Sequence, residues 1–154
     1  MAVSKGKQFE AKIKEQLNSI PGVLVERLYD VTNGYSKIKT PADYIVYKGD
    51  KLYYIECKSI HGPSIPLDNL TQLESLIDRC SKNDNVRGIF LIWFVDKQVT
   101  YCIDCNYVLK QLKNGCKRFN YLSLLNTQEE GFCVLQGVYK RLYGVYDFTN
   151  LWSM

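Results

Sequence analysis

Residues 88–95 read Gly-Ile-Phe-Leu-Ile-Trp-Phe-Val, an almost uninterrupted apolar run. Its length suits a β-strand and falls well short of the roughly 18 residues that a membrane-spanning helix requires. A uniformly apolar strand is typical of one that is buried on both faces of a sheet. The run therefore predicts a central strand with other elements packed on either side of it.

Periodic patterns elsewhere supply those elements. Phe9, Ile13 and Leu17 recur at helical spacing, Ser4 suits the N-cap, and Pro21-Gly22 ends the helix. The other predicted helices and strands are strands at 23–29, 43–47 and 52–59, a helix at 69–81, a strand at 98–104 and a helix at 106–113. With the apolar run, this order predicts an α/β fold with a central mixed β-sheet flanked by helices. No element is assigned beyond residue 119.

The chain of 154 residues is expected to form a single domain, residues 1–154, whose core needs no disulfides. Its first residues lack the apolar segment of a secretion signal, so a cytoplasmic protein is expected. The six cysteines are then ordinary thiols. The Cys102-x-x-Cys105 spacing, with Cys116 and Cys133 downstream, leaves a four-cysteine zinc site as an alternative.

Residues 30–39 are rich in polar and turn-forming types and predict a loop. Its basic side chains, with Tyr29 and Tyr35, are suited to contacting phosphates or stacking on bases. Lysines also gather in the first helix, although the net charge is only +4 and a solvated helix face is the alternative. The candidate DNA contacts are Lys5, Lys7, Lys12, Tyr35, Lys37 and Lys39.

The two strands at 43–47 and 52–59 carry the most distinctive polar residues. They are joined by the turn Lys-Gly-Asp-Lys and predict a β-hairpin. Alternation places Glu56 and Lys58 on one face of the second strand, while Asp43 opens the first. Two carboxylates with a lysine suit Mg²⁺ and metal-assisted phosphodiester cleavage. An exposed ion pair is the alternative.

These residues resemble the PD-(D/E)XK nuclease signature in the form Pro41-x-Asp43 followed by Glu56-x-Lys58. Further segments resemble the RecU-type Holliday-junction resolvases. These are Gly-Lys-Gln-Phe-Glu at 6–10, Tyr-Ile-Glu-Cys-Lys at 54–58, Ile-Pro-Leu-x-Asn-Leu-x-Gln at 65–72 and Gly-Ile-Phe-Leu-Ile at 88–92. The resemblance spans about residues 4–104. Residues 30–39 are much shorter than the stalk of that family, and the small size fits a phage-encoded version.

The resemblance implies a restriction-endonuclease-like fold and a role for each matching residue. Asp43 and Glu56 would bind Mg²⁺, for which Mn²⁺ substitutes, together with the Cys57 carbonyl. Lys58 would be the catalytic lysine. Glu10, a further candidate ligand, and Gln72 would complete the site. The family also implies a homodimer that cuts opposed strands of a four-way DNA junction.

Two other functions fit the same residues. A restriction-like, nicking or repair nuclease would cut unbranched DNA with the same site. A module that has lost catalysis would bind DNA or protein without cutting. A resolvase is the first hypothesis, because both the motif and the segments around it resemble the RecU-type resolvases.

Overall fold

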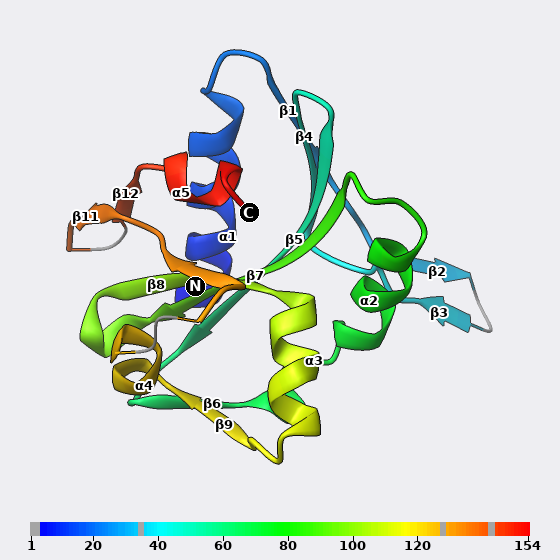
Figure 1. The fold of residues 1–154 in the computed structure, drawn as a ribbon. Helices are drawn as coiled ribbons and strands as arrows, with labels where there is room; N and C mark the ends of the chain where they lie inside the picture. Colours follow the sequence, from blue (N-terminus) through cyan, green and yellow to red (C-terminus); the bar gives the residue numbers. More distant parts are fainter. Residues whose placement is uncertain (1–3, 34–35, 127–128, 142–143) are drawn as a thin grey trace.

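The computed structural model describes residues 4–33, 36–126, 129–141 and 144–154, except for the side chains of residues 31–38. Its centre is a mixed sheet of six strands in the order β1-β4-β5-β7-β8-β10 (Figure 1). The strands are β1 (Val23–Arg27), β4 (Tyr44–Lys48), β5 (Lys51–Ile60), β7 (Val86–Phe94), β8 (Val99–Asp104) and β10 (Phe132–Val134). β5 and β7 run parallel, and the other neighbours run antiparallel. The predicted mixed sheet flanked by helices is confirmed.

Strand β7 is buried from Ile89 to Phe94, as its uniform apolarity predicts. Its side chains alternate between two cores. Ile89, Leu91 and Trp93 belong to the core under α1 (Lys5–Asn18), and the intervening residues belong to the core on the opposite face. Strand β7 therefore contributes side chains to both hydrophobic cores.

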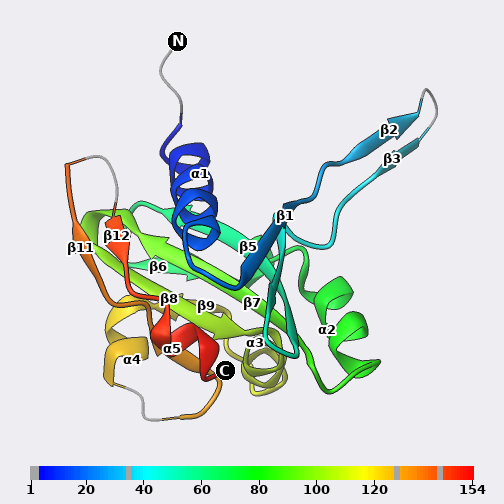
Figure 2. The same cartoon turned by 90° about the horizontal axis from the view of Figure 1, so that it is seen from above.

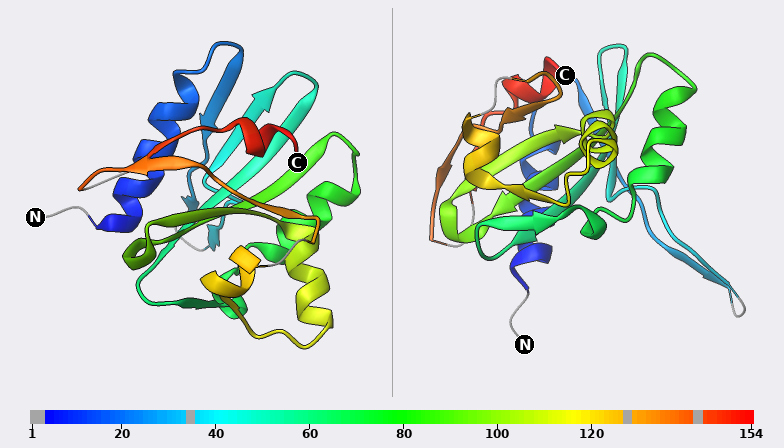
Figure 3. Two further views of the ribbon diagram at one scale, coloured as in Figure 1. Left: turned by 60° about the vertical axis from the view of Figure 1, so that its left-hand side comes forward. Right: turned by 60° about the horizontal axis from the view of Figure 1, so that its bottom comes forward.

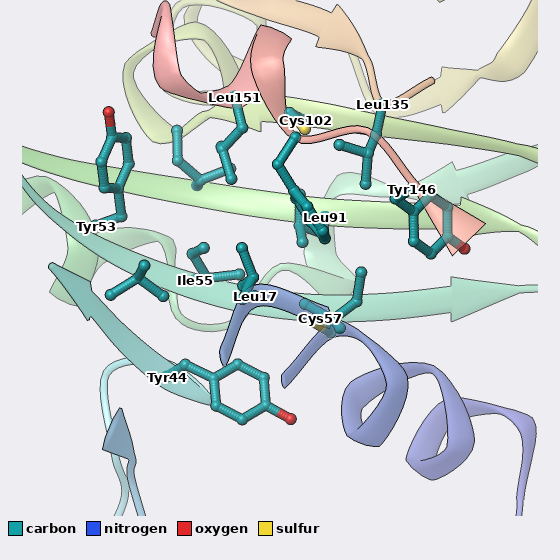
Figure 4. Close-up of a cluster of buried hydrophobic side chains, with 14 of the residues drawn as sticks. Leu17, Tyr44, Tyr53, Ile55, Cys57, Leu91, Cys102, Leu135, Tyr146 and Leu151 are labelled. Carbon is teal, nitrogen blue, oxygen red and sulfur yellow. The ribbon is translucent and has the colours of Figure 1, made fainter. Parts of the chain in front are cut away.

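The core under α1 is completed by the C-terminal segment, for which the sequence predicts no structure. This segment forms β11 (Gly137–Tyr139), β12 (Gly144–Tyr146) and α5 (Thr149–Trp152). Tyr146 and Leu151 pack with Leu17 of α1 and Leu91 of β7 (Figure 4). The Gln16 side chain donates to the Gly144 carbonyl and accepts from the Tyr146 amide, both at 2.8 Å. The segment is thus part of the main core.

The opposite face is covered by α2 (Leu73–Ser81) and α3 (Cys105–Lys113). The small sheet of β6 (Ser64–Pro66) and β9 (Arg118–Asn120), the turn η1 (Leu67–Asn69) and α4 (Tyr121–Asn126) extend this layer. A second 3₁₀ turn, η2 (Val95–Lys97), joins β7 to β8. None of the described helices is long and apolar enough to cross a membrane.

One predicted loop and two predicted element boundaries are wrong. Residues 30–39 are not a loop, because β2 (Val31–Asn33) and β3 (Ser36–Ile38) pair as a hairpin. This hairpin projects from the body of the molecule (Figures 2 and 3). The helix predicted from residue 69 begins at Leu73, since η1 precedes it, so Gln72 is its N-cap residue rather than part of its first turn. The strand predicted to residue 29 ends at Arg27.

The four-cysteine zinc alternative does not fit the structure. Cys102 and Cys105 are both buried, but Cys102 lies in the core under α1 and Cys105 in the core on the opposite face. Cys105 instead contacts Cys80, with 3.6 Å between the sulfur atoms. One ion cannot bind two thiolates that the sheet separates.

Candidate active site

The β4–β5 hairpin fixes Asp43 against strand β5. Lys48 pairs with Lys51, and Gly49 in the turn has a φ of 61°, which favours glycine. At the other end, the Asp43 amide donates to the Ile55 carbonyl at 3.0 Å. The Asp43 carboxylate then accepts from the Cys57 amide at 2.8 Å. This carboxylate is therefore locked beside the strand that carries Glu56.

Glu56 and Lys58 project from the same face of β5, as alternation predicts. The Lys58 Nζ lies 3.2 Å from Glu56 Oε1. The pair is not on an open surface, because the Glu56 side chain is only 8% exposed and that of Lys58 24%. A carboxylate held at this depth loses much of its hydration, so its charge needs neighbouring cations. The exposed ion pair considered from the sequence does not describe this site.

Glu10 approaches from α1, where it follows the buried Phe9. Its carboxylate is bound by Arg27, with 2.9 Å between Oε2 and Nη1. The same Arg27 nitrogen lies 3.6 Å from Asp43 Oδ1. The Tyr44 hydroxyl donates to the Glu10 carbonyl at 2.7 Å, which fixes the helix against β4. Glu10 and Asp43 thus share Arg27 as a partner, and Asp43 lies beside the strand that carries Glu56.

Sequence reasoning missed Arg27. Its signal was its place in the alternating series of β1, where it follows the buried Val23 and Val25. A charged side chain at the end of an inward-facing series points to a partner within the fold. The Arg27 guanidinium also lies 5.0 Å from the centre of the Tyr44 ring, within range of a cation–π contact.

Two carboxyl groups of the site, those of Asp43 and Glu56, have raised pKa values. Burial raises the pKa of Asp43 to about 6, and the negative charge of Glu10 adds to the rise. Burial raises the pKa of Glu56 to about 7, with a further rise from the charge of Asp43. Arg27 and Lys58 oppose these shifts only in part. A site of this kind favours an added cation, and strongly shifted acids are frequent in catalytic sites.

The acids open onto a cleft of about 540 Å³. Asp43 and Glu56 line it from the sheet, and Gln72 lines it from the start of α2. The Thr71 hydroxyl donates to Gln72 Oε1 at 3.2 Å. Residues 27–30, which leave the end of β1, form another wall of the cleft. Gln72, nominated from the sequence, therefore lies in the same cleft as the two motif acids.

The candidate DNA contacts occupy different places. Lys39 is exposed and lines the cleft. Lys5 and Lys7 are exposed on the first turn of α1, and Lys12 pairs with Glu15 at 3.0 Å. Tyr35 lies outside the described residues, as does the side chain of Lys37.

The donors that the chain offers suit Mg²⁺. Among the described residues, no three His, Cys, Asp or Glu side chains gather as a ready-made ligand cluster. Asp43 and Glu56 are joined by a third donor, the Cys57 carbonyl. This carbonyl points toward Asp43, because Ile55, two residues earlier on the strand, accepts from the Asp43 amide. Mg²⁺ is usually held by one or two carboxylates with waters and substrate oxygens, so the donors fit.

Comparison with known proteins finds similarity among solved structures only. No family model matches the chain, and no curated protein matches its sequence. Among solved structures, the chain is similar to that of Hjc, a Holliday junction resolvase from the archaeal hyperthermophile Archaeoglobus fulgidus. The similarity has a TM-score of 0.48 and 17% identity, and covers 66% of this chain and 78% of that chain. The chemistry of the cleft is therefore what indicates a function.

Proposed function

We propose that the chain is a Mg²⁺-dependent endonuclease that resolves four-way DNA junctions by hydrolysing phosphodiester bonds. The observation that carries this proposal is the convergence of Asp43 and Glu56, both with raised pKa values, on one open cleft, with Lys58 bound to Glu56. Two dehydrated acids beside a lysine are costly for a fold unless they serve a ligand. A divalent cation and a phosphodiester together supply the charges that this site lacks.

Each residue has a role in that reaction. Asp43 and Glu56, with the Cys57 carbonyl, would hold Mg²⁺ or Mn²⁺, which acidifies a bound water and offsets phosphate charge. The Lys58 ammonium would position the attacking water and stabilise the charge that develops on the phosphate oxygens. Gln72 would donate a hydrogen bond to the phosphate from the opposite wall. Glu10 acts through Arg27, which it orients toward Asp43.

The junction as substrate and a homodimer as the active form belong to the same proposal. One chain offers one such cleft among its described residues, so symmetric cutting of two opposed strands requires two copies. The projecting β2–β3 hairpin leaves the body from the segment that lines the cleft, which favours a substrate that extends beyond one duplex (Figure 3). Such a protein would act in the cytoplasm of a bacterial or phage-infected cell.

The test uses purified protein with Mg²⁺, a four-way junction, and a linear duplex of the same sequence. We expect paired, symmetric cuts in the junction and little cutting of the duplex. Asp43→Asn should abolish cleavage, and calorimetry should show that it weakens Mg²⁺ binding. Equal cutting of both DNAs would replace the resolvase with a nuclease for unbranched DNA. Absence of metal binding that depends on Asp43 and Glu56 would indicate a binding module.

A further inference from the structure

Tyr29 presents an exposed aromatic ring in the wall of the cleft. Its exposed fraction, 72%, is greater than that of any other large hydrophobic side chain among the described residues. It lines the same cleft as Asp43 and Glu56. A single exposed aromatic ring is not unusual in itself, but a ring in the wall of a cleft that also holds acids is suited to ligand recognition.

The backbone that carries this ring is held on both sides. The Leu28 amide donates to the Asp43 carbonyl at 2.9 Å. The Asp30 carboxylate accepts from the Thr40 amide at 2.9 Å. Tyr29 lies between these two attachments, so the position of its backbone relative to Asp43 is set before any ligand arrives. A segment that is already held in place loses less entropy on binding than a free one.

Arg27 connects the ring to the acids. Its guanidinium lies 5.9 Å from the centre of the Tyr29 ring and 3.6 Å, at Nη1, from Asp43 Oδ1. A ligand group that covers the ring is therefore adjacent to the metal-binding acids. Next to a phosphodiester that is being cut, the flat group available is a nucleobase.

We propose that Tyr29 stacks on a base that has left its stack beside the scissile phosphate. Bases of an intact duplex already stack on their neighbours. A base is therefore available to stack on the Tyr29 ring only where the stack is interrupted, as at a branch point or a bulge. The inference rests on the proposed nuclease function and narrows its substrate class. The enzyme selects a base that is free to unstack next to the cut, and the branch point of a four-way junction, where stacking is interrupted, is one place that allows it.

Stacking of a base on an aromatic side chain predicts a discrimination of roughly 5- to 150-fold between DNA with and without a displaced base. A linear duplex with a one-nucleotide bulge should therefore be cut in preference to a fully paired duplex. Tyr29→Phe should keep this preference, because phenylalanine retains the ring. Tyr29→Leu should lower the ratio of the two kcat/KM values toward one, and its folding is checked by circular dichroism.

The experiment compares both variants with wild type and with Tyr47→Leu, a matched change at a 42% exposed tyrosine outside the cleft lining. Cleavage is measured with Mg²⁺. Stacking is measured with Ca²⁺ in its place, from the fluorescence of 2-aminopurine at the bulged position. Wild type, Tyr47→Leu and Tyr29→Phe should quench this fluorescence on binding, and Tyr29→Leu should not.

The outcomes separate the two proposals. An unchanged cleavage ratio and unchanged quenching in Tyr29→Leu would overturn the role of Tyr29 while leaving the nuclease intact. A wild-type protein that quenches the fluorescence but cuts no DNA with Mg²⁺ would overturn the nuclease and support the stacking site. Loss of quenching in Tyr47→Leu as well would show that the signal does not report on the cleft, and would overturn the stacking role.

Discussion

The guanidinium of Arg27 binds the carboxylate of Glu10 at 2.9 Å, and this ion pair joins the edge strand β1 to helix α1. The same nitrogen approaches Asp43 at 3.6 Å. Arg27 therefore supplies positive charge to Glu10 and Asp43, and Lys58 supplies it to Glu56. These two residues offset the charge of the acids only in part, since the pKa values of Asp43 and Glu56 remain raised.

Arg27→Gln tests this balance. Because the positive charge of Arg27 lowers the pKa of Asp43, its removal should move that pKa above the present value of about 6. The free energy of unfolding at pH 8 should fall by about 1 kcal/mol, since two partly buried acids lose their partner. NMR titration and denaturant unfolding measure the two effects. Lys82→Gln, which breaks the exposed pair of Lys82 with Asp78, is the control and should change stability little.

Stability of the metal-free protein should fall as pH rises from about 4.5 to about 7. Glu56 has a pKa of about 7 in the folded protein, above its ordinary 4.5, so the folded state binds more protons than the unfolded state in this interval. Its ionisation costs on the order of 3 kcal/mol of folding free energy by pH 8. Glu56→Gln should make the profile shallower, leaving the part due to the raised pKa of Asp43, and should stabilise the metal-free protein at pH 8, whereas Glu15→Gln on the exposed face of α1 should do neither. A wild-type stability that rises between pH 5 and 7 would contradict the prediction.

Lys58→Ala should separate cutting from binding. In the proposed reaction Lys58 acts on the reacting phosphate, so cleavage should fall by about 100-fold or more. Binding of a junction with Ca²⁺ in place of Mg²⁺ should change little, because the candidate DNA contacts, among them Lys39 in the cleft wall, are unchanged in this variant. Cleavage kinetics and fluorescence anisotropy measure the two quantities. Lys113→Ala, an exposed lysine of α3 away from the cleft lining, is the control. Equal losses of binding and cutting would assign Lys58 to DNA binding instead.

Leu151→Ala tests whether the C-terminal segment belongs to the core. Leu151 is fully buried in the cluster under α1. Its truncation should lower the free energy of unfolding by about 3 kcal/mol, because it leaves a cavity beside the sheet. Leu125→Ala, at a leucine that is 55% exposed, should change stability by less than about 0.5 kcal/mol. A similarly small loss of unfolding free energy in Leu151→Ala and Leu125→Ala would mean that the C-terminal segment packs loosely.

The central sheet was predictable because its signals are local. The apolar run of β7 and the alternation along β5 follow from the geometry of a strand, which sends successive side chains to opposite faces. The same alternation placed Glu56 and Lys58 together before any tertiary contact was known. The short C-terminal strands and the β2–β3 hairpin carry no comparable periodicity. They gain their stability from packing and pairing with distant residues, so the sequence did not reveal them.

For the candidate site too, some features follow from the sequence and others only from the tertiary structure. The residue types and spacing of Asp43, Glu56 and Lys58 were sufficient to predict two acids and a lysine on one hairpin. The tertiary structure alone decided how deeply the acids are buried, which raises their pKa values, and that Arg27 rather than solvent faces Glu10. The reason is physical: strand geometry is set by each residue and its neighbours, whereas hydration and charge pairing depend on every element that packs around the site.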